Sequence, residues 1–411
     1  MRSLDRVLLL VENNAYPFDV RVRREAQALR DAHYQVTVIA PRAAGQPWSE
    51  RLDGIDVYRF PAPPGGEGIL GYAFEFGYAT FAMLLLSIWA SLRKGFDVVH
   101  VANPPDTLFV IGAFFKLFGK KFVFDHHDLS PETYLSRFKE PKPNLVYRVL
   151  RFMERCTYAI ADIVIATNES YRKLATTRGN MSPDKVFVVR NGPPKTFVPL
   201  PPDPTLQARA KDLVGYIGTM GPQDGVDYWL RSVQHIVKTL GRTDFLTVII
   251  GSGDAAPSLH ALAKELDIEK HVWFTGRISD VDARTYLSTV AVCVQPDPLS
   301  PLNDKSTMNK VMEYMAMGKP LVAYDLVETR FSAGDAGLFA KPNDERDFAD
   351  KVCWLLDRPD EVAQRGAYGR VRAREIGWEA SIPNLLKAYA EGLGAVPRAA
   401  AESGAGATNK G

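Results

Sequence analysis

Residues 306–324 read STMNKVMEYMAMGKPLVAY, and this stretch predicts a helix that leads directly into a buried strand. Its apolar residues recur at the spacing of one helix face, namely Met308, Val311, Met312 and Met315. Ser306 or Thr307 is expected to cap this helix, and Gly318 with Pro320 ends it. The apolar residues that follow have the length and composition of a strand covered on both faces.

The same alternation of amphipathic segments and short apolar runs extends over most of the chain. Strands are expected at residues 6–12, 35–40, 55–60, 97–101, 121–124, 162–167 and 186–189, and then at 213–218, 245–251, 271–275, 290–295, 320–324 and 337–340. Repeated helix–strand units of this kind are typical of parallel sheets. The chain is therefore predicted to be α/β, with two doubly wound Rossmann-like domains and a ligand site in the cleft that they face.

A proline-rich break separates the two runs of strands. Residues 192–205 contain six prolines and are expected to form a stiff linker. The expected organisation is a first domain over 1–195, a linker over 196–212, a second domain over 213–375, a C-terminal helix over 376–394 that crosses back to the first domain, and a tail over 395–411. The tail is rich in Ala, Gly and Ser and is expected to be disordered.

Composition excludes several classes of protein. Of 411 residues, 46% are hydrophobic and 24% are charged, which fits neither a disordered chain nor a polytopic membrane protein. The net charge of +2 argues against a nucleic-acid partner, and the three scattered cysteines suit a reducing cytoplasm. Residues 1–195 nevertheless carry 26 basic and 20 acidic side chains, against 24 and 28 in the remainder.

Two stretches of the basic half suggest a membrane surface. Residues 76–92 lack charge over 17 positions, which is the lower limit for a span. A buried helix, a helix on a membrane surface and a span are the three interpretations, and the short length argues against the span. Residues 114–124, FFKLFGKKFVF, interleave phenylalanines with lysines as an anionic bilayer would favour, although these lysines could also be merely solvated.

Polar residues follow the strand predicted at 121–124. Asp125, His126, His127 and Asp128 come next, and a histidine at this end of a strand can reach a cleft and move a proton. Adjacent histidines on an extended chain point to opposite sides, so one of them is expected to face a ligand. Glu132 is expected to orient a ring nitrogen. The alternative is a histidine that packs the loop.

Glycine-rich loops follow two later strands. Residues 218–225 read GTMGPQDG and residues 251–253 read GSG, and such loops let a backbone approach a phosphate. The helix over 306–318 adds a polar face with Ser306, Asn309, Lys310 and Glu313, and its N-terminus suits an anion such as a diphosphate. Lys305 would add positive charge there. The alternative is a solvated polar face.

The order of these motifs resembles the retaining, group 1 glycosyltransferases of family four, which have the GT-B fold. The matching segments are His127-Asp128, Arg190-Asn191-Gly192, the loop from Gly218 to Gly225, Gly251-Ser252-Gly253, Phe274-Thr275-Gly276-Arg277 and residues 313–322. The resemblance extends over nearly the whole chain, between residues 6 and about 390.

The resemblance implies a nucleotide-sugar donor, of the UDP-sugar class, on the second domain and an acceptor on the first. It implies metal-independent transfer with retained configuration and without a cofactor. Glu313 matches the glutamate that holds the donor ribose, Arg277 and Ile278 would lie beside the base, and His127 would lie near the anomeric carbon. The donor site is expected to include Arg190, Asn191, Gly218, Thr219, Gly251, Gly253, Arg277, Ile278, Lys305, Ser306, Thr307, Asn309, Lys310 and Glu313.

Two departures from the family pattern concern charge. Lys305 stands where the family commonly has a glutamate that contacts sugar hydroxyls, and Thr219 and Asp224 stand where an Arg and a Lys commonly clamp the diphosphate. A diphosphate buried without compensation is costly. Lys305, Lys310 and either Arg190 or Arg277 are therefore expected to supply the positive charge.

The resemblance and the apolar 76–92 segment together indicate a glycan or isoprenoid-linked acceptor at the inner face of the plasma membrane. The protein would be cytoplasmic and peripheral, in polysaccharide or lipopolysaccharide synthesis, with direct front-face transfer. Two other functions remain open: a GT-B sugar-nucleotide epimerase, and a non-catalytic nucleotide-sugar-binding protein.

Overall fold

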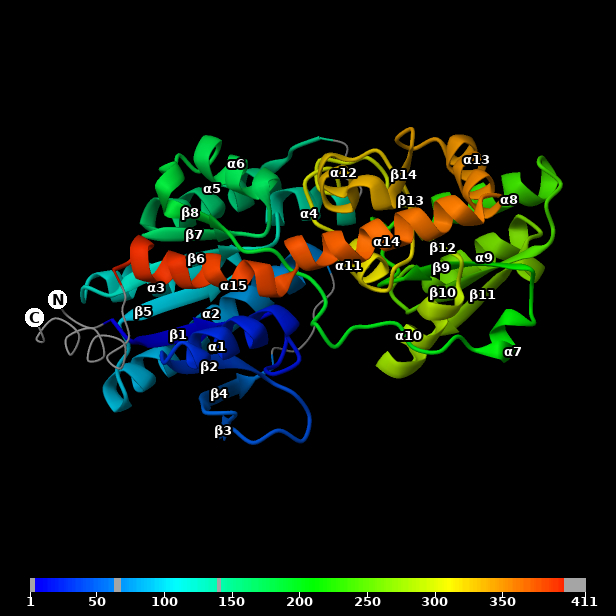
Figure 1. Cartoon of the computed structure of the whole chain (residues 1–411). Coiled ribbons are helices and arrows are strands. Elements are labelled where there is room, and N and C mark those ends of the chain that lie inside the picture. Colours follow the sequence, from blue (N-terminus) through cyan, green and yellow to red (C-terminus); the bar gives the residue numbers. More distant parts are fainter. Residues whose placement is uncertain (1–3, 63–67, 139–141, 395–411) are drawn as a thin grey trace, which may run out of the picture. The chain divides into compact units, whose positions relative to one another are not determined.

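The computed structural model describes residues 4–62, 68–138 and 142–394, and the chain divides into two compact units. Unit 1 holds Met1–Tyr134, Lys142–Val189 and Ser381–Gly411, and unit 2 holds Leu135–Pro141 and Arg190–Ala380. The tail predicted to be disordered, 395–411, lies outside the described residues. Figure 1 shows parallel strands flanked by helices in each unit.

Unit 1 is built on a sheet with the order β3-β4-β2-β1-β5-β6-β7-β8. Its strands are β1 (Arg6–Leu10), β2 (Gln35–Arg42), β3 (Ser49–Leu52), β4 (Ile55–Pro61), β5 (Val98–Ala102), β6 (Lys121–His126), β7 (Ile163–Ala166) and β8 (Val186–Val188). All neighbours are parallel except β3 and β4. The sequence does not predict β3, because this short edge strand exposes polar residues and has no apolar run.

The helices of unit 1 connect its parallel strands. They are α1 (Val20–Asp31), α2 (Gly68–Arg93), α3 (Phe109–Lys116), α4 (Ser130–Arg137), α5 (Leu145–Ile160) and α6 (Glu169–Thr177), with α4 continuing into unit 2. The Asp19 carboxylate caps α1 by accepting the Val22 N–H at 2.9 Å. This fixes the first turn of α1, which carries Arg21.

The sheet of unit 2 is entirely parallel, in the order β11-β10-β9-β12-β13-β14. Its strands are β9 (Asp212–Ile217), β10 (Phe245–Ile250), β11 (Val272–Gly276), β12 (Val292–Gln295), β13 (Leu321–Tyr324) and β14 (Gly337–Ala340). Alternate residues of one strand belong to different hydrophobic clusters: Val292 and Val294 to one, Cys293 to the other. The sheet therefore buries both faces, as the unbroken apolar runs predict.

Helices cover both faces of this sheet. They are α7 (Pro204–Gln207), α8 (Val226–Lys238), α9 (Ala256–Glu265), α10 (Asp280–Thr289), α11 (Asn309–Ala316), α12 (Val327–Ala333), α13 (Glu345–Leu356) and α14 (Pro359–Ile376). Trp229 of α8 and Phe348 of α13 pack on one face, while Leu287 of α10 and Met312 of α11 pack on the other. The doubly wound prediction is thus confirmed for this unit.

The predicted linker and the predicted C-terminal helix each have a defined place. The linker packs on α10, because the Leu200 N–H donates to Ser288 Oγ and the Asp203 N–H donates to Thr289 Oγ1, each at 2.9 Å. After α15 (Trp378–Lys387), a π-helical turn over Ala388–Gly392 belongs to unit 1. There Tyr389 is fully buried, and its hydroxyl lies 2.7 Å from His100 Nδ1.

Candidate active site

The carboxyl end of β6 carries the two adjacent histidines, and the structure separates them. His126 is buried, and its Nδ1 lies 2.9 Å from the Tyr158 hydroxyl. Burial and the nearby Arg178 lower the pKa of His126 to about 3, so this ring is a neutral core residue at physiological pH. His127 keeps 13% of its side chain exposed. Of the two, His127 is the one that a ligand can reach.

The backbone at His127 is held by Asn103, which directly follows β5. Asn103 Oδ1 accepts the N–H groups of His127 and Asp128 at 2.9 and 3.1 Å, while its Nδ2 donates to the Asp128 carbonyl at 2.8 Å. Asn103 is 1% exposed, so these bonds are shielded from water. The sequence does not identify Asn103 as a site residue, because an Asn before two prolines indicates only a turn.

The carboxylate nearest the His127 ring is Asp125, not the predicted Glu132. Asp125 Oδ2 lies 3.6 Å from His127 Nδ1. Glu132 instead accepts from Arg178 at 2.5 and 3.3 Å and so belongs to a separate ion pair. The prediction that Glu132 orients a histidine is therefore wrong, because its helix, α4, directs it toward Arg178.

In unit 2, the two predicted glycine loops pack against each other after β9 and β10. The Gly218 N–H donates to Ile250 O at 3.0 Å, and the Met220 N–H donates to Ser252 O at 3.2 Å. Gly251 has φ +127°, and a Cβ there would lie 2.0 Å from Gly218 O. The loops can approach this closely only because the residues are glycines.

Gly251→Ala is expected to destabilise unit 2 strongly, because it adds a backbone clash to an unfavourable φ. The matched control is Gly241→Ala, where φ is +67° but nothing lies within 4 Å of the added Cβ. This control should cost about 1–2 kcal/mol, the cost of the left-handed conformation alone. Chemical denaturation measures both variants, and equal losses would show that the close approach of the loops is unimportant.

Lys310 lies buried on the first turn of α11, between two aspartates. Its Nζ lies 2.9 and 2.8 Å from the Asp297 oxygens and 3.6 Å from Asp224 Oδ1. Gln295 Nε2 donates to Asp297 Oδ2 at 2.7 Å. Burial raises the pKa of Asp297 to about 6, although Lys310 opposes this rise. The ammonium group of Lys310 is thus paired with Asp297, and its contact with a diphosphate stays a prediction.

Lys310→Met is expected to destabilise the protein by about 3–5 kcal/mol, because Asp297 is left buried without its cation. The double variant Lys310→Met/Asp297→Asn should regain part of this loss. Lys305→Met is the matched control and should stay within about 0.5 kcal/mol, since Lys305 is partly exposed. Urea denaturation measures all three, and equal stability of the two single lysine variants would contradict the structural role of Lys310.

The helix predicted over residues 306–318 is α11, and it begins later than the sequence predicts. Its first residue is Asn309, and the backbone of Met308, not Ser306 or Thr307, forms the N-cap. The Ser306 hydroxyl donates to the Leu302 carbonyl at 2.8 Å, so it completes the preceding turn. Lys305 Nζ donates to the Pro301 carbonyl at 3.0 Å in that same turn.

Arg190 lies beside this turn rather than in open solvent. Its Nη2 donates to Ser332 Oγ at 2.7 Å and to Thr307 Oγ1 at 3.4 Å, and it lies 3.6 Å from Glu328 Oε2. The guanidinium also lies over the Phe331 ring, 4.9 Å from its centroid. Arg190 therefore supports the residues before α11 and brings Thr307 and α12 together.

The remaining predicted donor residues occupy the same edge of the sheet or its neighbourhood. Gly253 packs against the Met220 backbone, and the Thr219 carbonyl accepts from the Tyr216 hydroxyl at 3.0 Å. The Gly276 carbonyl accepts the Gly251 N–H at 3.1 Å, which places the exposed Arg277 and the partly buried Ile278 next to that loop. Asn309 is exposed, whereas Glu313 and Asn191 are partly buried.

Some residues that form ion pairs with the predicted residues could not be identified from the sequence. Asp297 comes two residues after the end of β12. The polar side chains of Gln295 and Asp297 at this strand end are the signal that could have identified it. Arg21 lies 104 residues before Asp125, to which it donates at 2.6 and 2.8 Å. Sequence spacing gives no sign of such a pairing.

Both halves of the chain match known protein families. Residues 211–358 match glycosyl transferases group 1, and residues 19–192 match the glycosyl transferase 4-like domain.

Two curated relatives share modest identity with the chain. D-rhamnosyltransferase WbpZ of Pseudomonas aeruginosa is 26% identical over 155 residues, which cover 37% of this chain and 40% of that protein. D-inositol 3-phosphate glycosyltransferase of Thermobispora bispora is 25% identical over 295 residues, which cover 68% of this chain and 67% of that protein. The chain thus spans between 40% and 67% of the length of these relatives.

Solved structures match over nearly the whole chain. Sucrose-phosphate synthase of Thermosynechococcus elongatus gives a TM-score of 0.78 at 17% identity, over 95% of this chain and 99% of that one. HepE of Anabaena, in complex with UDP, gives a TM-score of 0.64 at 15% identity, over 93% of this chain and 98% of that one. These likenesses show that the fold is GT-B.

Proposed function

The chain belongs to the group 1 glycosyltransferases, and we propose that it transfers a sugar from a UDP-sugar to a lipid-linked glycan, without a metal ion and with retained anomeric configuration. One observation carries the proposal. In each unit, polar groups meet at the carboxyl edge of a parallel sheet: His127 in unit 1, and the glycine loops with the start of α11 in unit 2. The choice of UDP is supported by the UDP complex of HepE, a protein with the same fold.

The donor diphosphate is proposed to bind the backbone of the Gly218 and Gly251 loops and the first turn of α11. The first N–H groups of a helix lack intrahelical acceptors and favour an anion. Lys305, which precedes the first turn of α11, is proposed to add positive charge for the diphosphate. Lys310 and Arg190, which are also expected to face the diphosphate, lie in ion pairs with Asp297 and Glu328.

His127 is proposed to lie beside the transferred sugar. In a front-face transfer, the bond from the acceptor oxygen to the anomeric carbon forms while the bond to the diphosphate breaks. The acceptor proton then passes to the departing phosphate oxygen. Hydrogen-bond donors aimed at that oxygen supply the main stabilisation, and the imidazole of His127 binds a sugar hydroxyl.

The first test is transfer from labelled nucleotide sugars to extracted lipid-linked acceptors, with UDP-sugars expected as donors. His127→Ala should lose about 99% of kcat, the loss of a group that contacts the reacting sugar, while its UDP affinity by calorimetry stays unchanged. His33→Asn, at an exposed left-handed position that Asn tolerates, is the matched control and should keep full activity. Near-normal turnover of His127→Ala would refute the assigned role.

The acceptor is proposed to be reached from a membrane surface that α2 contacts. Among the described residues, α2 is the helix that is long and apolar enough to cross a membrane. Only 11% of its most apolar 18-residue segment is buried inside the protein. Phe81 is 62% exposed and Leu92 is 83% exposed. Arg93 is the last residue of α2, and Lys94 follows it with its Nζ 2.6 Å from Asp56 Oδ2. A large apolar helix beside basic residues suits the interface of an anionic bilayer.

The lysines of the predicted basic stretch contribute less to this surface than the sequence suggests. Lys116 Nζ donates to the Ile160 carbonyl at 2.7 Å and to Asp162 Oδ2 at 3.0 Å. Lys121 Nζ lies 3.5 Å from Asp162 Oδ1. Because Asp162 offsets part of the charge of these two lysines, the membrane contact is proposed to rest mainly on apolar side chains of α2 and on Leu117 and Phe118 after α3.

Phe81→Ser/Leu85→Ser is expected to weaken binding to phosphatidylglycerol vesicles by at least about tenfold, because two exposed apolar side chains of one helix face are lost. Val281→Ser/Val371→Ser removes exposed apolar side chains from unit 2 and should leave vesicle binding unchanged. Vesicle flotation measures both. A wild-type protein that stays with the soluble fraction would contradict the membrane proposal without affecting the donor assignment.

A further inference from the structure

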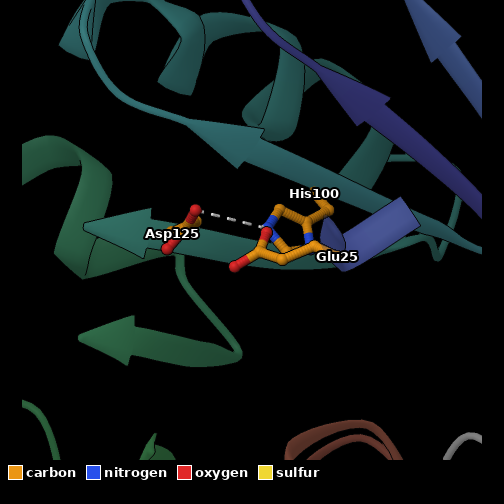
Figure 2. A group of neighbouring side chains, drawn as sticks. All are labelled: Glu25, His100 and Asp125. Carbon is orange, nitrogen blue, oxygen red and sulfur yellow. Dashed lines mark ion pairs between the residues drawn. The ribbon is translucent and has the colours of Figure 1, made fainter. Parts of the chain in front are cut away.

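A buried group of ionisable side chains lies next to His127 in unit 1, and Asp125 is the member nearest to the His127 ring. Arg21 donates to both Asp125 oxygens, at 2.6 and 2.8 Å, and its Nη1 donates to the Val189 carbonyl at 3.1 Å. Arg21 Nη2 also lies 3.1 Å from Glu25 Oε1. Figure 2 shows Asp125 on one side of His100, with Glu25 on α1 beside the same ring. His100, Glu25 and Asp125 are fully buried.

The protonation states within this group follow from burial and from Arg21. Burial raises the pKa of Glu25 well above its usual value, and Arg21 does not offset the rise. Burial would also raise the pKa of Asp125, but the Arg21 guanidinium holds it well below its usual range. Burial lowers the pKa of His100. The group therefore centres on the Arg21–Asp125 ion pair, and burial favours the uncharged forms of Glu25 and His100.

Glu25, His100 and Asp125 bring ligand atoms within 4.8 Å of one another, as a metal site would. Their bonds favour another role. Both Asp125 oxygens face the Arg21 guanidinium, and the Tyr389 hydroxyl lies 2.7 Å from His100 Nδ1. A divalent cation would have to displace a paired arginine from a buried carboxylate, which is strongly unfavourable.

We infer that Asp125, fixed by Arg21, is a positioning residue that orients the imidazole of His127. Asp125 Oδ2 lies 3.6 Å from His127 Nδ1, while Asn103 holds the backbone of the same residue. At this distance the carboxylate acts by charge attraction rather than by a hydrogen bond, and it favours the ring tautomer with the proton on Nδ1 and with Nε2 directed away from itself. This inference rests on the proposed function, because it assigns to Nε2 the contact with the transferred sugar.

Asp125→Asn should lower kcat by about 10–100-fold with the donor KM within about twofold, as for other residues that orient a catalytic histidine. In a His127→Ala background, the same substitution should cause no further loss, because Asp125 acts through His127. An equal loss of kcat in both backgrounds would overturn the inference. Glu25→Gln is the matched control and should keep activity, because Glu25 belongs to the same buried group but lies beside Arg21 and His100 rather than His127.

A spectroscopic measurement on the wild-type enzyme keeps the inference testable if Asp125→Asn fails to fold. Nitrogen-15 histidine NMR, with the His127 signals assigned from their absence in His127→Ala, should show the proton on Nδ1. A proton on Nε2 would overturn the inference.

The kinetic results also separate this inference from the proposed function. Full turnover of His127→Ala would refute the catalytic assignment itself. Lost turnover of His127→Ala with normal turnover of Asp125→Asn would refute the positioning role alone.

Discussion

A charge can be buried in a protein only beside a partner, and this requirement determines how the carboxyl edge of the first sheet is built. Arg21 and Asp125 are both almost completely removed from water, and their bidentate contact joins α1 to β6. The same arginine donates to Val189, just after β8. One ion pair therefore sets the relative positions of three segments, and His127 follows two residues after its acidic member.

The second sheet meets the same requirement with Lys310 and Asp297. This pair joins the first turn of α11 to the end of β12, and Asp224 brings the first glycine loop to the same point. Lys310 is therefore part of the framework on which the loops rest. The loop backbone, the start of α11 and Lys305 are the groups proposed to recognise an anionic ligand.

The sequence predicts the α/β class and most of the strands because parallel strands bury both faces and so have unbroken apolar runs. β3 was missed because polar residues on an edge need no such run. The start of α11 was placed too early because Ser306 is a good cap by residue type, yet its hydroxyl donates to Leu302 instead. Short-range preference cannot tell these two uses of a serine apart.

Candidate site residues were predictable where a motif is local, as with His127 and the two glycine loops. Their partners were not, because Arg21 and Asn103 reach the residues after β6 only through the strand order. Glu132 is the counterexample: it is near His127 in sequence but pairs with Arg178. The pairing of Lys310 with Asp297 was not predictable for the same reason, since nothing in the sequence around Lys310 shows that Asp297 faces it.

The central claim is that the buried pairs form the framework, and that the loop backbone with Lys305 recognises the donor. A crystal structure with the nucleoside diphosphate of the preferred donor tests this most directly. The account predicts the diphosphate against the Gly218 and Gly251 loops and the first turn of α11, near Lys305, with Lys310 still paired to Asp297. A diphosphate bound by a Lys310 that has left Asp297, or bound away from these loops, would contradict it.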